Sequence, residues 1–416
     1  MSSNSKPIRL GIVGLSARGG WAASAHVPAL SHHSLQSTFT LSALQASSAS
    51  SASAAKEKYA ASWPSSDGLE VTAYHGDDAS ELCNDPSVEV VAVTIKAPDH
   101  KAVVDKAIAA GKHIFIEYPP GRTLAESEQM RADVMKNGNI QAMVGLQGVH
   151  SAALRKVKKI LDSGKIGRVI STTVVANIAR EFRFYGPEAV DQNIYAQDRA
   201  NGATMLSIVI AHQLSSLIHL LGPFASISSI ASKQYPTTKI YSIKEPQKLV
   251  RSIAANSPDH FVFAGALKSG AQASVTWRSG YKSVPGRKNL LWIIDGEEGC
   301  VKFEVDDGPS QTGATPFGAT PFINLADPTI TVNGQPLDEY LTTEGIEWEE
   351  DAALVVEKHE KGTFVEFVRR EWVEFGKSLR GGQGEFATLD DAIEVQKVVD
   401  AVERSAQLGG LGIKLI

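Results

Sequence analysis

The chain has 416 residues, of which 43% are hydrophobic and 21% are charged, and its formal net charge is −5. This length exceeds the size at which a single core usually stops growing, so we expect two domains, and the composition argues against wholesale disorder. The slightly acidic balance offers no positive field to a phosphate backbone, which argues against direct nucleic-acid binding.

The cysteines and the apolar runs indicate the class of protein. Cys83 and Cys300 show neither CxxC spacing nor a cluster with histidine, so we expect two buried thiols in a reducing compartment, no disulfide framework and no metal site. The polar N-terminus lacks the apolar stretch of a signal peptide, and the longest apolar runs are shorter than the roughly 20 residues of a spanning helix. We therefore expect a cytoplasmic protein without a membrane partner.

The first third of the chain alternates β-branched runs with helical patterns, which is typical of a parallel sheet built from βαβ units. The run 46–55 contains only Ser and Ala and predicts a loop followed by a weakly specified helix start. We assign residues 1–150 to a dinucleotide-binding domain of the Rossmann type, with a doubly wound parallel sheet. The predicted strands are 8–13, 39–44, 88–95 and 113–117, and a helix is predicted over 101–110.

From residue 151 the pattern changes to consecutive strands separated by turns. It predicts an α+β domain over 151–416, with a large, open, mostly antiparallel sheet, so the whole chain has an α/β fold. An open sheet face needs a cover, and we expect a homodimer formed through this sheet. The predicted elements are helices 154–161 and 201–221, strands 169–175, 261–266, 273–277, 290–295 and 300–303, an exposed loop over the repeat 313–322, and a final helix preceded by Thr388 with Asp391 as an approximate capping box.

The first strand leads into a turn of small residues, which would let the backbone approach a pyrophosphate at a helix N-terminus. The motif departs from GxGxxG because Ser16 stands where the second glycine is expected, so a purely structural tight turn is the alternative. The residues predicted to contact the dinucleotide here are Gly14, Leu15, Ser16, Arg18, Gly19 and Trp21.

The end of the second strand indicates which dinucleotide is bound. An Asp or Glu there would accept hydrogen bonds from the ribose of NAD, but the chain has Gln45-Ala46-Ser47-Ser48. Without that acid a 2′-phosphate is not repelled, and Ser47 or Arg18 could donate to it. NADP is therefore favoured, and NAD stays possible.

Three later segments resemble the glucose-fructose oxidoreductase/inositol dehydrogenase (Gfo/Idh/MocA) family. They are TIKAPDH at 94–100, AAGKHIFIEYP at 109–119 and LDSGKIGRV at 161–169. In that family the first lines the nicotinamide side, the second ends in Glu-Lys-Pro and the third enters the second domain. The resemblance covers about residues 7–222 and implies Lys96, Pro98, His100 and Glu117 as further cofactor-binding residues.

Two departures from the family lie where its chemistry is expected. Tyr118 replaces the Lys of Glu-Lys-Pro, and Ile208 replaces the Asp of an Asp-x-x-x-His pair whose histidine is His212. The segments GLSARGGWA at 14–22, LQG at 146–148, PDH at 258–260 and KNL at 288–290 resemble a branch represented by the fungal repressor of the galactose regulon. That relative binds the dinucleotide but represses by holding a transcription activator. The branch resemblance extends to about residue 304 and adds Gln147 to the predicted cofactor contacts.

The resemblance implies Tyr118 and His212 as catalytic residues. His212 has an intrinsic pKa suited to proton transfer near neutral pH, whereas Tyr118 would need a lowered pKa for which the sequence shows no cause. The alternative is that Tyr118 packs over the nicotinamide and His212 belongs to a buried network. The predicted substrate contacts Arg180, Arg183 and Tyr185 follow the first strand of the second domain, and the two arginines either bind a carboxylate or sugar hydroxyls or form a solvated rim.

Two functions follow from these observations. The first is an NAD(P)-dependent oxidoreductase with an altered proton relay, acting on a small hydroxyl, carbonyl or imine substrate, which the retention of His212 favours. The second is a catalytically silent, dinucleotide-sensing regulator that binds an acidic activator peptide and enters the nucleus, which the loss of the Lys and the Asp favours. We prefer the oxidoreductase because one fold hosts many chemistries.

Overall fold

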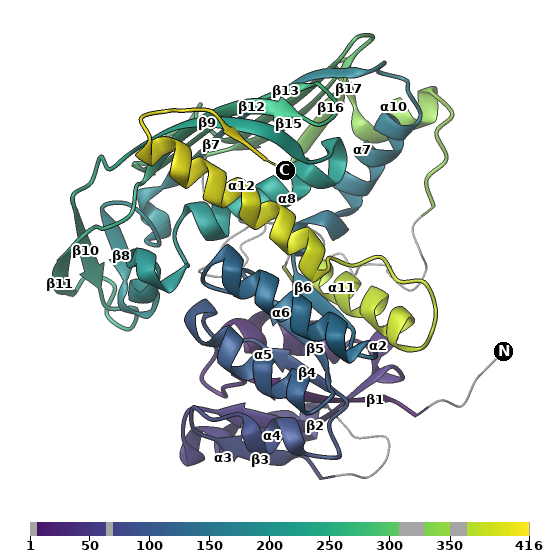
Figure 1. Cartoon of the computed structure of the whole chain (residues 1–416), viewed down its shortest axis with the longest axis vertical. Coiled ribbons are helices and arrows are strands. Elements are labelled where there is room, and N and C mark those ends of the chain that lie inside the picture. The colour runs from purple at the N-terminus through teal and green to yellow at the C-terminus, as the bar shows by residue number, and fades with distance from the viewer. Residues whose placement is uncertain (1–5, 64–69, 308–327, 350–363, 416) are drawn as a thin grey trace. The chain divides into compact units, whose positions relative to one another are not determined.

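The computed structural model describes residues 6–63, 70–307, 328–349 and 364–415 (Figure 1). The predicted loop over the repeat 313–322 lies outside them. The described residues of Met1–Gln147 and Glu350–Ile393 form one compact unit, and those of Gly148–Glu349 and Glu394–Ile416 form another. The sequence pattern predicts a single division of the chain, after residue 150. In the structure a later segment also belongs to the first unit, so the second unit is not one continuous segment.

The first unit is built on a six-stranded parallel sheet in the order β3-β2-β1-β4-β5-β6. β1 pairs with β2 on one side and with β4 on the other, so the strand order reverses beside β1. The predicted doubly wound Rossmann sheet is confirmed, and such sheets bind nucleotides at the carboxyl ends of the strands beside this reversal. The strands are β1 (Ile8–Val13), β2 (Phe39–Ala46), β3 (Thr72–His75), β4 (Val90–Val93), β5 (His113–Glu117) and β6 (Ala142–Gly145).

Helices cover the sheet, and its central strands, such as β2 and β4, are therefore buried along their whole length. α3 packs against β2 and β3, α5 packs against β4 and β5, and α11 packs against η1, α1 and β6. Trp372 of α11 stacks on Phe115 of β5 with ring centroids 5.0 Å apart. The helices are η1 (Ala22–His26), α1 (Val27–Leu30), α2 (His33–Gln36), α3 (Ala49–Ser62), α4 (Ser80–Asn84), η2 (Ala97–Asp99), α5 (His100–Ala109), α6 (Leu124–Asn137), η3 (Gln147–His150) and α11 (Phe364–Leu379).

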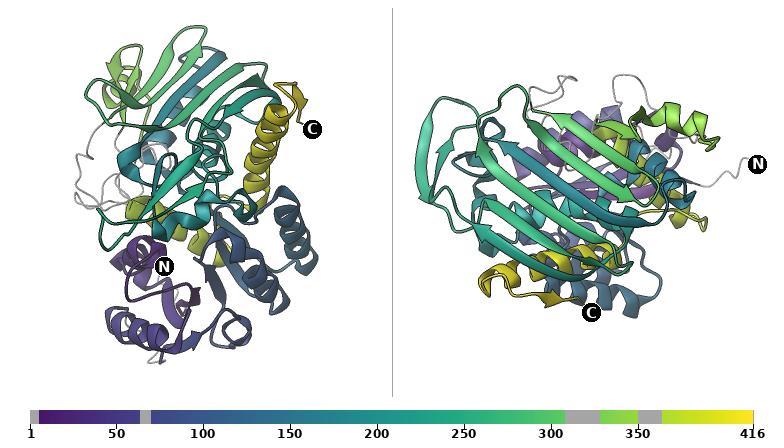
Figure 2. Two further views of the ribbon diagram at one scale, coloured as in Figure 1. Left: turned by 90° about the vertical axis from the view of Figure 1, so that its left-hand side faces the viewer. Right: turned by 90° about the horizontal axis from the view of Figure 1, so that it is seen from above.

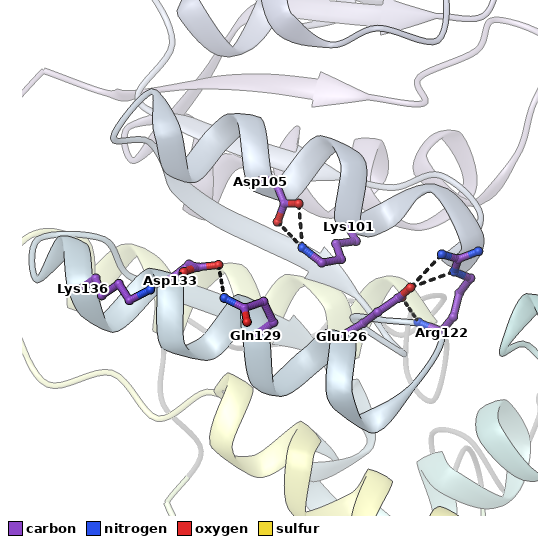
Figure 3. A network of polar contacts seen from close by, with 7 residues as sticks. All are labelled: Lys101, Asp105, Arg122, Glu126, Gln129, Asp133 and Lys136. Atoms are coloured by element: carbon purple, nitrogen blue, oxygen red, sulfur yellow. Dashed lines mark hydrogen bonds and ion pairs between the residues drawn. The ribbon is translucent and has the colours of Figure 1, made fainter.

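The outer faces of α5 and α6 carry a network of charged side chains (Figure 3). Lys101 bonds both oxygens of Asp105 four residues on, and Arg122 donates through its side chain and its backbone to Glu126. Pairs at this spacing stabilise a helix by a few tenths of a kcal/mol each. This network is a solvated surface that supports the two helices, and it is not part of the site described below.

The second unit contains a nine-stranded sheet in the order β17-β16-β15-β14-β7-β13-β12-β9-β18. Within this sheet β7 and β13 run parallel and the other neighbouring pairs of described strands are antiparallel, in agreement with the predicted, mostly antiparallel sheet. A separate sheet has the order β11-β10-β8. The strands are β7 (Val169–Ala179), β8 (Glu188–Val190), β9 (Phe224–Ser232), β10 (Thr237–Tyr241), β11 (Leu249–Ala254), β12 (His260–Leu267), β13 (Gln272–Tyr281), β14 (Lys288–Gly296), β15 (Cys300–Asp306), β16 (Thr329–Val332), β17 (Gln335–Pro336) and β18 (Ile413–Lys414).

One face of the nine-stranded sheet is covered within the unit and the other is open. Along β13, Val275 and Trp277 are buried whereas Gln272 and Ser274 are exposed, which is the alternation of a half-buried sheet. Figure 2 shows the strands side by side, with one broad face toward the viewer in the right-hand view. The helices of the unit are α7 (Ala152–Asp162), η4 (Arg180–Phe182), η5 (Asp191–Gln197), η6 (Arg199–Asn201), η7 (Leu206–Ile210), α8 (Ala211–Leu221) and α10 (Leu337–Thr343).

Two helical segments have a further structural feature. Arg199–Leu221 is long and apolar enough to cross a membrane, although no such segment was predicted from the sequence. However, 72% of its most apolar window is buried inside the protein, as in a core helix. α12 (Leu389–Gln407) continues from the first unit into the second. It begins at the predicted capping box, because Thr388 donates its backbone N–H to Asp391 and accepts one in return.

Candidate functional site

The turn after β1 depends on Gly14. Its backbone N–H donates to the carbonyl oxygen of Gln45 at 2.9 Å, and its φ of 103° lies in the region that favours glycine. A Cβ on Gly14 would lie 2.9 Å from the carbonyl oxygen of Thr94 and 2.8 Å from the Ile95 side chain. The chain therefore passes between the ends of β2 and β4 with no room for a side chain, which is the close backbone approach expected of a pyrophosphate turn.

Helix α3 holds the turn in place. The Tyr59 hydroxyl donates to the carbonyl oxygen of Ser16 at 3.0 Å, and the Lys58 ammonium donates to that of Ala17 at 3.0 Å. In a trans peptide the C=O and the next N–H point in opposite directions, so the N–H of Ala17 points away from α3. The turn is thus oriented to offer a backbone donor. Neither α3 residue is predictable from the sequence, because nothing in a Ser/Ala-rich helix indicates which side chains contact an earlier turn.

The other predicted residues of the turn have different environments. Leu15 is fully buried in the core, so only its backbone is available to a ligand. Arg18 and Gly19 are exposed, and a Cβ on Gly19 would meet no atom within 4 Å. The Ser16 hydroxyl accepts the backbone N–H of Arg18 at 3.2 Å.

The helix after the turn opens with a π-turn, η1, in which hydrogen bonds join residues five apart. Trp21 and His26 have this spacing, and both reach the same oxygen of Glu117 at the end of β5. The Trp21 indole donates to Glu117 Oε1 at 2.6 Å, and His26 Nε2 forms a short hydrogen bond with that atom. A Cβ on Gly145 would lie 2.8 Å from Glu117 Oε2, so β6 also limits the position of this carboxylate.

The polar side chains at the end of β2 differ in burial and in their hydrogen-bond partners. Gln45 is buried and donates its amide to the carbonyl oxygens of Gly76 at 2.8 Å and Asp78 at 3.2 Å, so it faces the loop after β3. Ser47 is exposed beyond the strand end, and Ser48 caps α3 by accepting the N–H of Ser51. Of the side chains predicted to select the dinucleotide, Ser47 and Arg18 are therefore the accessible ones.

The loops after β4 and β5 are tied together by His100. Its Nδ1 lies 2.9 Å from the carbonyl oxygen of Pro119 and its Nε2 lies 3.0 Å from that of Ile95. Burial lowers the pKa of His100, so the neutral ring donates one of these bonds at a time. Both ring nitrogens face backbone, which leaves neither for the predicted cofactor contact. Lys96 is exposed and Pro98 is half-buried in the short helix η2 beside it.

Gln147 and Tyr118 lie beyond the ends of β6 and β5. Gln147 is buried, and within the described residues its Oε1 atom has no hydrogen-bond partner. Buried polar groups are rarely left unpaired, so this oxygen fits a donor supplied by a ligand. Tyr118 is also buried, and burial raises its pKa, whereas a role as a base requires the pKa to be lowered.

The second unit contains the other predicted site residues. His212 is buried on α8, beside Gln213, whose two amide atoms have no hydrogen-bond partner among the described residues. Tyr185 is buried and donates to the carbonyl oxygens of Ala203 and Thr204, at 3.4 and 3.3 Å, so its hydroxyl is held within the protein and its contact with substrate stays a prediction.

The two predicted arginines have different surroundings. Arg183 adopts a positive φ of 48°, donates to Glu188 at 3.2 Å and to the Pro246 carbonyl oxygen at 2.5 Å, and lies over the Tyr241 ring. Its guanidinium is therefore held by the protein rather than left free as a fork for a substrate. Arg180 is exposed at the end of β7 and keeps the predicted accessibility.

A nicotinamide dinucleotide fits the residues of the first unit. Gly14 provides the space that a Cβ would fill, the turn is held with a backbone N–H directed away from α3, and Gln147 offers an unpaired buried acceptor. Among the described residues no group of three or more His, Cys, Asp or Glu could hold a metal ion. Burial raises the pKa of the Cys83 thiol to about 11, as expected of an inert, buried cysteine.

Comparison with known families identifies the two halves of the chain. Residues 8–146 match the oxidoreductase family with an NAD-binding Rossmann fold, and residues 152–305 match the C-terminal domain of Gal80p. The first part of the chain is therefore a dinucleotide-binding domain of the Gfo/Idh/MocA family. The second part of the chain is Gal80p-like, and the resemblance inferred from sequence is confirmed.

Several relatives resemble this chain along most of its length. The dehydrogenase aclE of Aspergillus oryzae is 28% identical over 411 residues, covering 97% of this chain and 98% of that protein. The galactose/lactose metabolism regulatory protein GAL80 of Kluyveromyces lactis is 26% identical and covers 73% of this chain and 65% of that protein. The crystal structure of a super-repressor mutant of Gal80p from Saccharomyces cerevisiae has a TM-score of 0.76 at 20% identity, covering 98% of both chains, which shows a shared fold.

Proposed function

We propose that the protein is an NAD(P)-dependent dehydrogenase that acts on a small hydroxyl, carbonyl or imine substrate. The observation that carries this proposal is the similarity to the dehydrogenase aclE, which extends over 97% of the chain and therefore through both units. The dinucleotide turn, with its glycine at a close backbone approach and its carbonyls held by α3, supports the same function.

The cofactor would be held by the first unit. Gly14, Ser16 and Ala17 provide the backbone for the pyrophosphate, and Glu117 and Gln147 provide side-chain oxygens for hydrogen-bond donors of the nicotinamide half. The nicotinamide supplies a hydride acceptor or donor when it is bound. The exposed Arg18 and Ser47 favour NADP, since a guanidinium and a hydroxyl both donate to a 2′-phosphate.

The proton of the substrate needs its own group. His212 is the candidate in the second unit, because an imidazole can take up or release a proton near neutral pH. Tyr118 is suited to a different role. Because burial raises its pKa, its hydroxyl stays protonated at neutral pH and acts as a hydrogen-bond donor rather than as a base.

The experiment that tests this function measures nicotinamide absorbance at 340 nm. The purified full-length protein is mixed with NADP(H) or NAD(H) and a panel of sugars, polyols, ketones and cyclic imines, while calorimetry measures dinucleotide affinity. We expect binding of NADP(H) and turnover of at least one panel class. Tight dinucleotide binding with no turnover across the panel would count against the dehydrogenase.

A second function is favoured by one observation, the match of residues 152–305 to the C-terminal domain of Gal80p. In this alternative the protein binds a dinucleotide without turnover and holds an acidic activator peptide. The missing family Lys and Asp, replaced by Tyr118 and Ile208, are consistent with it. An acidic peptide that bound only when the dinucleotide was present would support the regulator.

The open face of the nine-stranded sheet would be covered by a second copy of the chain. Ile230 of β9 and Val262 of β12 are register partners on this face, and their exposed fractions are 68% and 51%. The neighbouring exposed side chains, such as Ser228, Ala264 and Ser274, are small, so the face is smooth enough to pack closely against another sheet.

A further inference from the structure

A chain of hydrogen bonds runs from the C-terminal helix α11 to the carboxylate at the end of β5. The Trp372 indole N–H donates to His26 Nδ1 at 3.0 Å, and His26 Nε2 bonds Glu117 Oε1. Trp372 and His26 are fully buried, and the Glu117 side chain is 13% exposed. All three residues belong to the first unit.

This chain determines which nitrogen of His26 carries the proton. An indole N–H can only donate, so Nδ1 must act as the acceptor. The proton of the neutral ring is then on Nε2, which points at Glu117 Oε1, so His26 donates to the carboxylate. The reverse tautomer would set the N–H of Trp372 against the N–H of His26 and the Nε2 lone pair against the carboxylate. Trp372 therefore acts on Glu117 through the tautomer of His26.

Glu117 Oε1 thus accepts two N–H donors, from His26 and from Trp21, which the π-turn η1 sets five residues apart. The aromatic packing fixes the donors as well. The His26 ring meets Phe115 edge-on at a centroid distance of 4.9 Å and meets Trp372 edge-on at 6.0 Å. With Oε1 occupied by protein, Oε2 is the oxygen of Glu117 that remains to accept a donor from a ligand.

We propose that His26 and Trp372 are positioning residues that hold the Glu117 carboxylate, as an acceptor, for the nicotinamide half of the dinucleotide. This inference rests on the proposed dinucleotide site and deepens it. It makes Trp372 of α11, 346 positions from His26 in the sequence, a determinant of cofactor affinity. It also accounts for the two N–H donors beside the carboxylate, since they occupy Oε1 and leave Oε2 for the ligand.

The first test reads the tautomer directly. Long-range ¹H–¹⁵N correlation spectra of the ¹⁵N-histidine-labelled full-length protein distinguish the Nδ1–H from the Nε2–H form, and a His26→Gln spectrum identifies the signal. We expect the Nε2–H form in the wild type and a loss of that preference in Trp372→Phe. A wild-type His26 in the Nδ1–H form would overturn the proposal.

The second test reads dinucleotide affinity by calorimetry. His26→Leu removes the donor to Glu117 and is expected to weaken NADP(H) binding about tenfold, whereas His26→Gln keeps an N–H near Nε2 and should restore affinity to within about threefold. Trp372→Phe should weaken binding by about three- to tenfold. Its matched control is Trp63→Phe, because Trp63 is equally buried in the same core but its indole N–H has no partner among the described residues.

The outcomes separate this proposal from the proposed function. If Trp372→Phe and Trp63→Phe weakened dinucleotide binding equally, the effect would be one of packing and the positioning role would be overturned. The dehydrogenase proposal would still stand, provided that the wild type binds the dinucleotide. Equal affinity of His26→Leu and His26→Gln would likewise overturn it. A wild-type protein that binds neither NADP(H) nor NAD(H) would remove the proposed site itself, and this inference with it.

Discussion

The hydroxyl of Tyr59 on α3 donates to the carbonyl oxygen of Ser16 at 3.0 Å, and so a helix after the second strand orients the turn after the first. This contact fixes one peptide plane of the turn, and the neighbouring Lys58 fixes the next. The orientation of backbone donors toward a pyrophosphate therefore depends on two side chains that belong to no dinucleotide motif.

We expect Tyr59→Phe to weaken dinucleotide binding by about three- to tenfold, since it removes one hydrogen bond worth about 1 kcal/mol from the turn. Calorimetry with NADP(H) measures the change. Tyr74→Phe is the matched control, because Tyr74 donates to Asp85 at 3.1 Å in the same unit but does not touch the turn. Equal losses in the two variants would contradict a specific role for Tyr59.

The Gly14→Ala variant tests the close approach in the turn. Alanine at this φ is strained by about 1 kcal/mol, and its Cβ would also lie 2.9 Å from the Thr94 carbonyl oxygen, so we expect lost stability together with loss of dinucleotide affinity. Gly76→Ala separates the two effects, because Gly76 has a similar φ of 101° but an open space around its Cβ. Thermal unfolding and calorimetry on both variants measure the difference. If Gly14→Ala bound the dinucleotide normally, the turn would be misplaced.

Glu371 makes stability depend on pH. It is buried on α11, its carboxyl oxygens have no hydrogen-bond partner among the described residues, and burial together with the nearby Glu117 raises its pKa well above the usual range. A folded-state pKa above the unfolded one contributes stability that is complete below about pH 4.5 and is lost as pH rises toward the folded pKa. Glutamine cannot ionise and does not incur this loss.

We therefore expect the melting temperature of Glu371→Gln to exceed that of the wild type by an amount that grows from pH 5 to pH 8, by about 2–4 °C for each kcal/mol. Thermal unfolding across this pH range measures it, with the exposed Glu128→Gln as control. A constant difference between Glu371→Gln and the wild type at all pH values would contradict the assignment.

The proposed chemistry predicts different effects for its two candidate residues. His212→Ala should lower turnover by about 100-fold or more if the imidazole moves the substrate proton. Tyr118→Phe should lower it by a smaller factor that is constant from pH 6 to pH 9, because burial raises the Tyr118 pKa and keeps the hydroxyl protonated in this range. Steady-state rates at 340 nm measure both. Unchanged rates in both variants would remove the catalytic assignment while leaving the enzyme class in place.

The proposed dimer is tested on the open sheet face. The double variant Ile230→Lys and Val262→Lys places two charges on paired positions of β9 and β12, and we expect it to elute as a monomer in size-exclusion chromatography with light scattering. Met135→Lys is the control, since Met135 is a similarly exposed apolar residue on α6 and is not part of this sheet. A wild-type protein that is already monomeric would contradict the second copy.

The strand and helix patterns were readable from the sequence where they are strong and local. The strands at 8–13 and 113–117 were predicted with the observed bounds, and the helix predicted over 101–110 lies at His100–Ala109. The run of Ser and Ala predicted only a weak helix start, yet it forms the beginning of a helix that extends from Ala49 to Ser62. Its low apolar contrast gave no period to read, and its packing against β2 and β3 supplies the stability that its pattern lacks.

The sequence by itself determined the parallel Rossmann sheet and the position of the turn at Gly14, because apolar periodicity and glycine spacing act over a few residues, and its motifs carried the family resemblance. Only the tertiary structure decided what each polar side chain does. In the folded protein His100 and Arg183 bond backbone carbonyls, and Tyr185 is buried. His26 accepts a hydrogen bond from Trp372, which lies 346 positions away in the sequence. The physical reason is that a hydrogen bond between buried groups depends on which elements pack together, and packing joins residues that no local pattern connects.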